Sequence, residues 1–191
     1  MVLTIRQRME WIAMRPLDWA RFWNSTAAEN AADYPAHRYA TAPYRTVIRA
    51  VDVAAPPAVV FRWLCQLKVA PYSYDRLDNG GRRSPRELTP GAEKLAVGQR
   101  LIVARIVEFE PDRHITAVSL PAPTAVFGAF SLTYQVTATA GGSRLVACLD
   151  PTARSRVARL RADLLTIGDL VMMRKQLLNL KALAERSAVP A

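Results

Sequence analysis

The chain has very little cysteine, with only Cys65 and Cys148 among 191 residues. Two cysteines exclude a disulfide-rich scaffold and a cysteine-rich zinc module, and we expect both thiols to be free and buried. Glycine (8 residues) and proline (13 residues) are too few for a collagen-like or low-complexity chain. The two histidines, His37 and His114, form no metal-binding motif, so we expect neither a metal nor another cofactor.

Long apolar runs are also missing. Charged residues such as Arg6, Arg8 and Glu10 interrupt the apolar N-terminus, which excludes the apolar region of a secretion signal. The one long uncharged run, 115–143, contains prolines and alternates apolar with hydroxyl side chains in its second half. This alternation is typical of a β-strand with one buried face rather than a membrane helix. We therefore expect a soluble, cytoplasmic protein.

The composition that remains is globular and strongly basic. Hydrophobic residues make up 51% and charged residues 22%, and the formal net charge is +10. Such a charge suits nucleic acid, a membrane surface or an anionic ligand, or simply an arginine-rich solvated surface. Nucleic-acid binding favours aromatic residues interleaved with basic ones. Only the N-terminal segment has this mixture, so we expect no nucleic-acid partner.

Residues 1–42 are predicted to form a helical arm outside the main domain, 43–188. Apolar residues at helical spacing run from Ile5 to Trp23, and Pro16 should divide them into two helices. Three of the four tryptophans lie in this arm among arginines: Trp11, Trp19 and Trp23. These tryptophans either anchor the arm on the domain, which we favour, or make a peripheral contact with an anionic membrane surface.

The domain itself has the pattern of an α+β fold. Segments rich in β-branched residues or alternating with period two predict strands at 44–53, 100–110, 114–120, 127–139 and 143–149. Helical spacing predicts helices at 58–68, 74–79 and 154–186. Short connections between the later strands predict an antiparallel meander, with Gly141-Gly142 as a hairpin turn.

The long C-terminal helix is expected to cover this sheet with an apolar stripe. The stripe consists of Val157, Leu160, Leu164, Ile167, Val171 and Leu178, with Leu165, Gly168 and Met172 beside it. A twisted antiparallel sheet curls, and one helix does not fill its concave side. We therefore expect an apolar cavity between sheet and helix, which is the default binding site of such an architecture.

This order of elements resembles a known superfamily. Strand 44–53, the sequence Ala54-Ala55-Pro56-Pro57, the helix that follows, the meander and the long terminal helix are similar to START-like proteins, also called SRPBCC or helix-grip. The stretch from Trp63 to Asp75, with Asp78-Asn79 and 83–88, resembles an uncharacterised bacterial branch. The resemblance covers about residues 44–185.

The resemblance implies a curved antiparallel sheet wrapped around a long C-terminal helix, with two short helices after the first strand. It also implies a hydrophobic small molecule or lipid as partner. Members of the superfamily include lipid-transfer proteins and polyketide cyclase-like proteins, so binding and catalysis are both open.

Candidate site residues follow from these expectations. We expect the cavity to be lined by Trp63, Tyr74, Phe109, Phe130, Leu132, Tyr134, Leu164, Gly168 and Met172. Tyr74 and Asp75, in the densest polar and aromatic cluster, are the candidate catalytic residues, with Asp75 as a base if it is desolvated. The alternative is structural, with Asp75 or Asn79 capping a turn and the tyrosines packing.

Two further groups of polar residues have alternative interpretations. His114 follows a tight turn at a strand start, so we expect it to be exposed and not catalytic. Four arginines crowd the start of the long helix, where they oppose the helix dipole: Arg154, Arg156, Arg159 and Arg161. They either meet an anionic partner such as a phospholipid headgroup or point into solvent.

The sequence thus predicts a protein that binds or carries a hydrophobic small molecule or lipid without catalysing a reaction. The alternative is a metal-free enzyme of the polyketide cyclase or dehydratase type that uses the same cavity. A third hypothesis is a membrane-surface module anchored by the N-terminal arm.

Overall fold

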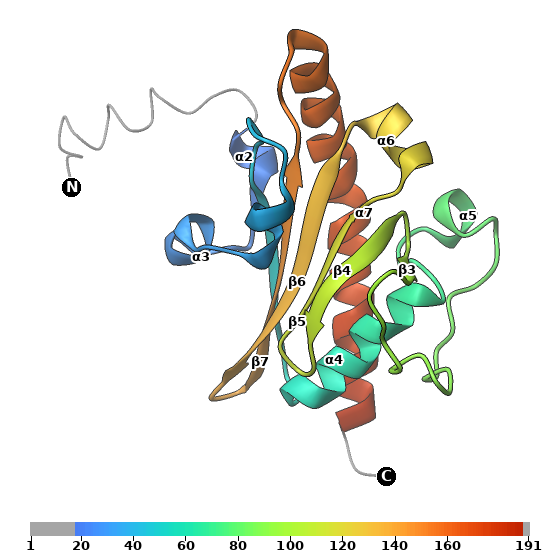
Figure 1. Ribbon diagram of the computed structural model, residues 1–191. Coiled ribbons are helices and arrows are strands. Elements are labelled where there is room, and N and C mark those ends of the chain that lie inside the picture. Colours follow the sequence, from blue (N-terminus) through green and yellow to red (C-terminus); the bar gives the residue numbers. More distant parts are fainter. Residues whose placement is uncertain (1–17, 189–191) are drawn as a thin grey trace, which may run out of the picture.

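The computed structural model describes residues 18–188, and its centre is one curved sheet (Figure 1). Within these residues the sheet has seven strands, in the spatial order β1 (Phe22–Trp23), β2 (Val47–Val53), β7 (Gly142–Pro151), β6 (Phe130–Thr139), β5 (His114–Ser119), β4 (Ala104–Glu110) and β3 (Arg100–Leu101). Neighbouring strands are antiparallel except β1 and β2, which are parallel. The expected meander is confirmed.

Helices surround this sheet. In the described residues they are α2 (Asp18–Arg21), α3 (Ala27–Ala31), η1 (Pro35–Tyr39), α4 (Pro57–Cys65), η2 (Gln66–Lys68), α5 (Asp75–Asp78), α6 (Pro121–Phe127) and α7 (Arg156–Ala188). None of the helices in residues 18–188 combines the length and the apolar character needed to cross a bilayer.

The helix α4 begins where two prolines meet. Pro57 occupies the first turn, where its missing N–H costs no hydrogen bond. One face of α4 then buries Val60, Trp63 and Leu64 between the sheet and α7. Figure 1 shows α4 crossing near the C-terminal end of α7, so α4 closes this end of the curved sheet, whereas α5 lies to the side of β3.

The long helix α7 confirms the expected length but not the expected face. Much of the predicted stripe is exposed, with Val157 and Leu160 each 61% exposed. Leu164 is 62% exposed but lies at the cavity described below, as do Leu165, Gly168 and Met172. The side that packs on the sheet and α4 carries a second set of residues: Ala162, Thr166, Met173, Gln176, Leu177, Leu180, Leu183 and Ala184. Their spacing is also helical. Both sides of the helix carry apolar residues, and the side with small Ala162 and Ala184 approaches the sheet.

Two local details differ from the sequence expectation. The segment 121–127 forms α6, because Pro121 suits a first helical turn, and Gly128 ends it with φ +85°. Strand β6 therefore starts at Phe130 and not at Phe127. The register pairs Thr139 with Gly142, so the hairpin turn is Ala140-Gly141, one residue earlier than expected. Gly142 instead lies against β2, where a Cβ would come 2.3 Å from the Val53 carbonyl oxygen.

Residues 27–39 of the arm pack on the convex face of the sheet, away from α7, whereas α2 and Trp23 lie beside α7. Tyr34 and Ala36 bury Ile48, Ala50 and other small side chains of β2 and β7 in a second apolar cluster. Polar contacts add to this packing. They join Glu29 to Arg144 at 2.8 Å and Arg38 to Glu108 at 2.5 Å.

The tryptophans of the arm are described only in part. Trp23 lies in β1, half-buried, with the Arg174 guanidinium 5.5 Å from its ring centre. Trp11 and the helix expected before Pro16 lie outside the described residues, as does the side chain of Trp19.

Candidate functional site

A cavity of about 500 Å³ separates the concave face of the sheet from α7. Its walls come from the loop after α4, the β3–β4 corner, β6, β7 and α7. The lining residues are Pro71, Ser73, Asp78, Leu101, Ile102, Val103, Ala104, Phe130, Leu132, Tyr134, Leu149, Arg161, Leu164, Leu165, Gly168, Asp169, Met172, Met173 and Gln176. The volume is that of a site for a drug-sized molecule.

Most of this lining is apolar. Phe130 and Leu132 project from β6, where alternate residues face α7. Leu165 and Met172 face them from the helix. Gly168 leaves the helix surface open at this level, because a Cβ added there would meet no atom within 4 Å.

One polar group of the cavity is a buried tyrosine. The Tyr134 hydroxyl donates to Gln176 Oε1 at 2.5 Å, and Gln176 Nε2 donates to the Pro71 carbonyl oxygen at 2.6 Å. Burial raises the pKa of the Tyr134 phenol, so it is neutral and remains a hydrogen-bond donor. This chain of bonds fixes the tyrosine and ties β6 to α7 and to the loop after α4.

The second polar group is Asp169 on α7. Its Oδ2 is buried without a hydrogen-bond partner, and Arg49 Nε lies 3.4 Å from it. Burial raises the pKa of the Asp169 carboxyl to about 6, although the nearby guanidinium acts in the opposite direction. A carboxylate with one oxygen that forms no hydrogen bond therefore lies at the wall of a largely apolar cavity.

Hydrogen bonds to backbone carbonyl oxygens hold the Arg49 side chain next to Asp169. Its guanidinium donates to the carbonyl oxygens of Ala20 and Arg21 at 2.7 Å each, and to that of Thr166 at 3.2 Å. Burial lowers the pKa of the Arg49 guanidinium, and Asp169 counters this. The arginine thus links α2, β2 and α7, and it supplies the positive charge nearest to Asp169 along this face.

The mouth of the cavity carries further polar residues. Asp78 of α5 lines it and accepts a hydrogen bond from the Ser73 hydroxyl. Arg161 lines it from α7, whereas Arg154 lies elsewhere and donates to the Ala42 carbonyl oxygen. Of the four arginines at the start of α7, Arg161 is thus the one that reaches the cavity.

Six of the nine residues expected to line the cavity do so: Phe130, Leu132, Tyr134, Leu164, Gly168 and Met172. Trp63 is buried instead at the contact of α4 with α7, where its indole N–H donates to Ser187. Phe109 packs half-buried on the core, and Tyr74 is 39% exposed. These three side chains lie outside the lining.

The geometry of Asp75 agrees with the structural alternative and not with a place in the cavity. Its carboxylate accepts hydrogen bonds from the backbone N–H and the hydroxyl of Ser84, at 2.9 and 2.6 Å. Neither Asp75 nor Tyr74 lines the cavity. The geometry of Asp75 is that of a residue that holds a loop.

His114 is also placed differently. It was expected to be exposed, but its side chain is only 17% exposed and its Nε2 lies 3.1 Å from Glu108 Oε1. The same carboxylate accepts hydrogen bonds from Arg38 and Tyr39 of the arm. His114 therefore belongs to the polar contact between arm and sheet.

Sequence reasoning missed Asp169, Arg49 and Gln176. For Arg49 a signal exists, because it alternates with Val47 and Val51 on the buried side of a strand. For Asp169 the signal is its helical spacing from Thr166 and Met173, which face the sheet. That signal is usable only once the orientation of α7 is known.

No protein-family model matches the chain, and a search of curated proteins finds no match. Solved structures do match. The protein MLL2253 from Mesorhizobium loti has 17% identity and a TM-score of 0.51, over 76% of this chain and 100% of its own. The di-domain ARO/CYC protein StfQ of the steffimycin biosynthetic pathway has 15% identity and a TM-score of 0.51, over 80% of this chain and 54% of its own.

A third match is a plant enzyme. A point mutant of norcoclaurine synthase from Thalictrum, in complex with a transition-state analogue, has 12% identity and a TM-score of 0.50, over 76% of this chain and 97% of its own. At these identities the likeness concerns the fold. With its curved sheet around a long terminal helix, the chain has the helix-grip fold that the resemblance of its sequence implied.

Proposed function

We propose that this protein binds and carries a hydrophobic small molecule or lipid in the cavity between sheet and α7. The observation that carries the proposal is the cavity itself, about 500 Å³ in volume and lined largely by apolar side chains of β6 and α7. Burial of apolar ligand surface contributes about 25 cal/mol per Å² before the costs of ordering.

The polar groups define the ligand further. Asp169 Oδ2 has no hydrogen-bond partner, and a pKa of about 6 leaves this carboxyl ionised at neutral pH. The Asp169 side chain lines the cavity and is 10% exposed, so its carboxylate accepts a hydrogen bond from a ligand at its exposed part and not at the inaccessible Oδ2. The ligand that fits is an apolar molecule with one hydroxyl or similar donor. A wholly apolar ligand leaves the carboxylate unpaired, which costs binding energy.

A thermal-shift screen with fatty acids, sterols, quinones and polyketides tests the proposal. A ligand present at one hundred times its Kd should stabilise the protein by about 2.7 kcal/mol. We expect at least one alcohol-bearing class to raise the melting temperature. If saturating doses of all four classes leave it unchanged, the proposal fails.

Gly168 offers a matched pair of variants for this screen. Gly168→Leu fills the cavity from the helix side without a clash at its Cβ, so the shift caused by the ligand should disappear. Gly168→Ala adds only a methyl group and should keep the shift, while helix propensity raises the stability of the free protein by up to about 1 kcal/mol. If Gly168→Leu responds like the wild type, the ligand does not occupy this cavity.

One observation favours a second function, a cyclase- or dehydratase-like enzyme. A carboxyl with a raised pKa and a neutral tyrosine face the same cavity, and acid–base catalysis requires such a pair. The match to StfQ, an ARO/CYC protein, and to norcoclaurine synthase supports this candidate by fold. In this proposal Asp169 acts as the base, and the Tyr134 hydroxyl donates to the substrate by giving up its hydrogen bond to Gln176 Oε1.

Substitution of Asp169 distinguishes the carrier proposal from the enzyme proposal. For any molecule found to bind, we expect Asp169→Asn to abolish turnover while the variant still binds. Asp75→Asn, which alters a carboxyl outside the cavity, is the control and should retain turnover. If the bound molecule is recovered unchanged from the wild type, the enzyme proposal fails and the carrier proposal stands.

A further inference from the structure

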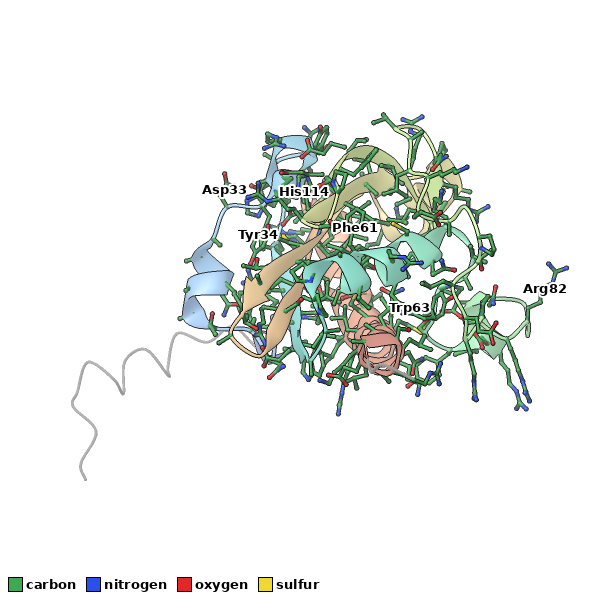
Figure 2. The ribbon with its side chains drawn as sticks, turned by 90° about the horizontal axis from the view of Figure 1, so that it is seen from below. Asp33, Tyr34, Phe61, Trp63, Arg82 and His114 are labelled. Carbon is green, nitrogen blue, oxygen red and sulfur yellow. The ribbon has the colours of Figure 1, made fainter. Side chains whose placement is uncertain are left out.

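A second cluster of reactive side chains lies on the convex face of the sheet, on the other side from the cavity. His37 comes from η1 in the arm, and Cys148 and Asp150 come from alternate positions of β7. Figure 2 shows the neighbouring arm residues Asp33 and Tyr34 on the outer side of the strands, away from Trp63 and α7. The cluster takes no part in the proposed cavity function.

The three donor atoms are nearly equidistant, and the contact between His37 and Asp150 is too long for a hydrogen bond, whereas the two contacts of the sulfur have lengths that S–H hydrogen bonds also reach. His37 Nε2 lies 3.7 Å from Cys148 Sγ and 3.7 Å from Asp150 Oδ2, and Sγ lies 3.8 Å from the same oxygen. An N–H···O bond would be about 2.7–3.2 Å long. Donors bound to one tetrahedral zinc ion, at about 2.0–2.3 Å, lie about 3.3–3.8 Å from each other. The three atoms therefore have the separations of ligands that share an ion.

The burial of Cys148 and Asp150 also favours a bound cation. Cys148 and Asp150 are wholly buried, and the carboxylate accepts a bond of 2.8 Å from the Thr46 hydroxyl at Oδ1. Its other oxygen, Oδ2, has only the long contacts to the thiol and the imidazole. A buried carboxylate beside a buried sulfur is costly without a cation between them.

The imidazole is oriented for coordination. Asp33 Oδ1 lies 2.8 Å from His37 Nδ1, a shorter contact than that of the Tyr34 backbone nitrogen at 3.3 Å. The Tyr34 N–H donates to Nδ1 only when the ring proton is on Nε2. Metal binding selects the other tautomer, in which the proton lies on Nδ1, directed at Asp33, and the lone pair of Nε2 faces Cys148 and Asp150. A carboxylate behind a histidine is a common arrangement at zinc sites. The Tyr44 ring stacks on the imidazole and fixes its plane.

Two unpaired hydroxyls provide an independent observation. Ser131 is fully buried, and its Oγ has no hydrogen-bond partner. The register pairs Ser131 with Asp150, so both side chains lie on the convex face. Thr152 Oγ1, two residues beyond Asp150, is also buried and unpartnered. Buried polar atoms without partners are rare in proteins, so unsatisfied hydroxyls on the strand positions around Asp150 mark this part of the convex face as one that can bind a polar or charged group.

The same residues also suggest a nucleophilic cysteine, with Asp33, His37 and Cys148 as a triad. That reading fits less well. The Cys148 thiol is 0% exposed, and the adjacent Asp150 carboxylate disfavours a free thiolate. A nucleophile needs access and a neighbouring positive charge, whereas a thiolate that binds a cation gains from a second anionic ligand.

We propose that His37, Cys148 and Asp150 bind one divalent transition-metal ion, with zinc as the best match to a nitrogen, sulfur and oxygen donor set. Asp33 is a positioning residue for His37, and water completes the coordination. The ion joins the arm to β7. The proposal reverses the expectation from the sequence, where 111 residues separate His37 from Cys148.

Cobalt substitution of the full chain, with any affinity tag removed, tests this site. Co²⁺ should bind one per chain and produce the thiolate-to-cobalt charge-transfer band of a cysteine ligand, and added Zn²⁺ should abolish the band. Absence of the band in folded protein at saturating Co²⁺ would overturn the proposal.

Matched variants identify the ligands. Cys148→Ser should remove the charge-transfer band, and Cys65→Ser, which alters the other buried thiol, should retain it. His37→Gln, which keeps a polar side chain of similar size, should weaken cobalt binding at least tenfold. His114→Gln should not change it, although His114 also lies near carboxylates. Retention of the band in Cys148→Ser, or its loss in Cys65→Ser, would contradict the assignment.

The cobalt affinity of an Asp33 variant tests whether this residue positions His37. Asp33→Asn should weaken cobalt affinity about 10- to 100-fold and leave the charge-transfer band in place at saturation. An unchanged affinity would remove Asp33 from the site. Circular dichroism of each variant establishes that it is folded before metal is added.

Discussion

Asp169 is the residue on which the proposed chemistry depends. It lies in an apolar cavity, with its nearest positive charge, Arg49 Nε, at 3.4 Å and no hydrogen bond to Oδ2. Desolvation opposes ionisation more strongly than the guanidinium favours it, so the pKa rises. The protein keeps this carboxyl at a cost in stability, which is typical of a group retained for function.

This cost predicts a pH dependence. A carboxyl whose pKa is raised in the folded state stabilises the protein most below its unfolded pKa, and this contribution is lost as the pH rises through the folded value. An increase from 3.8 to about 6 corresponds to about 3 kcal/mol. We compare the unfolding free energy of the wild type with that of Asp169→Asn. As the pH rises from about 4 to about 7, the wild type should lose about 3 kcal/mol relative to the variant.

Urea unfolding of both proteins across this pH range measures the effect. Above pH of about 7 the difference between them should be constant, because Asp169 is then ionised in both states. A difference that does not vary with pH would mean that the folded pKa of Asp169 is ordinary.

At the scale of elements, the orientation of α7 decides which residues form the site. The helix has apolar residues on two sides, and Leu160 faces solvent while Leu177 is fully buried. The spacing of apolar residues identifies an apolar face of the helix, but it does not show which of two such faces packs on the sheet. Tertiary packing selects the side where Ala162 and Ala184 allow close approach to the sheet and α4.

Two leucine variants test this orientation. Leu177→Ala should lower the unfolding free energy by about 2–5 kcal/mol, because it opens a cavity in the core. Leu160→Ala, on the solvent side, should change it by less than about 0.5 kcal/mol. Equal losses from the two substitutions would show that both sides of α7 are buried.

The sequence predicted most elements because their signals are local. Alternation located β4 to β7, and Pro57 located the start of α4. The helix α6 was missed because its two prolines indicate a loop as readily as a first helical turn. The lining residues of β6 were predictable from alternation. Trp63 was not, because only the packing of α4 on α7 places its ring outside the cavity.

At the scale of the whole molecule, the curved sheet separates two sites. Its concave face and α7 enclose the cavity, and its convex face carries the arm with His37 against Cys148 and Asp150 (Figures 1 and 2). Alternate residues of β7 serve the two faces: Leu149 lines the cavity, and its neighbours Cys148 and Asp150 face the arm. Residues distant in sequence meet at both sites, so motif spacing revealed neither Asp169–Arg49 nor His37–Cys148.

The central claim is that the cavity holds a guest molecule. Native mass spectrometry of the purified protein, with Gly168→Leu prepared in parallel, tests this most directly. We expect the wild type to carry a fraction of chains with one bound small molecule, released as an apolar species on denaturation, and the variant to carry none. If both proteins have only the mass of the bare chain, or if both carry the same adduct, the cavity is not the binding site that we propose.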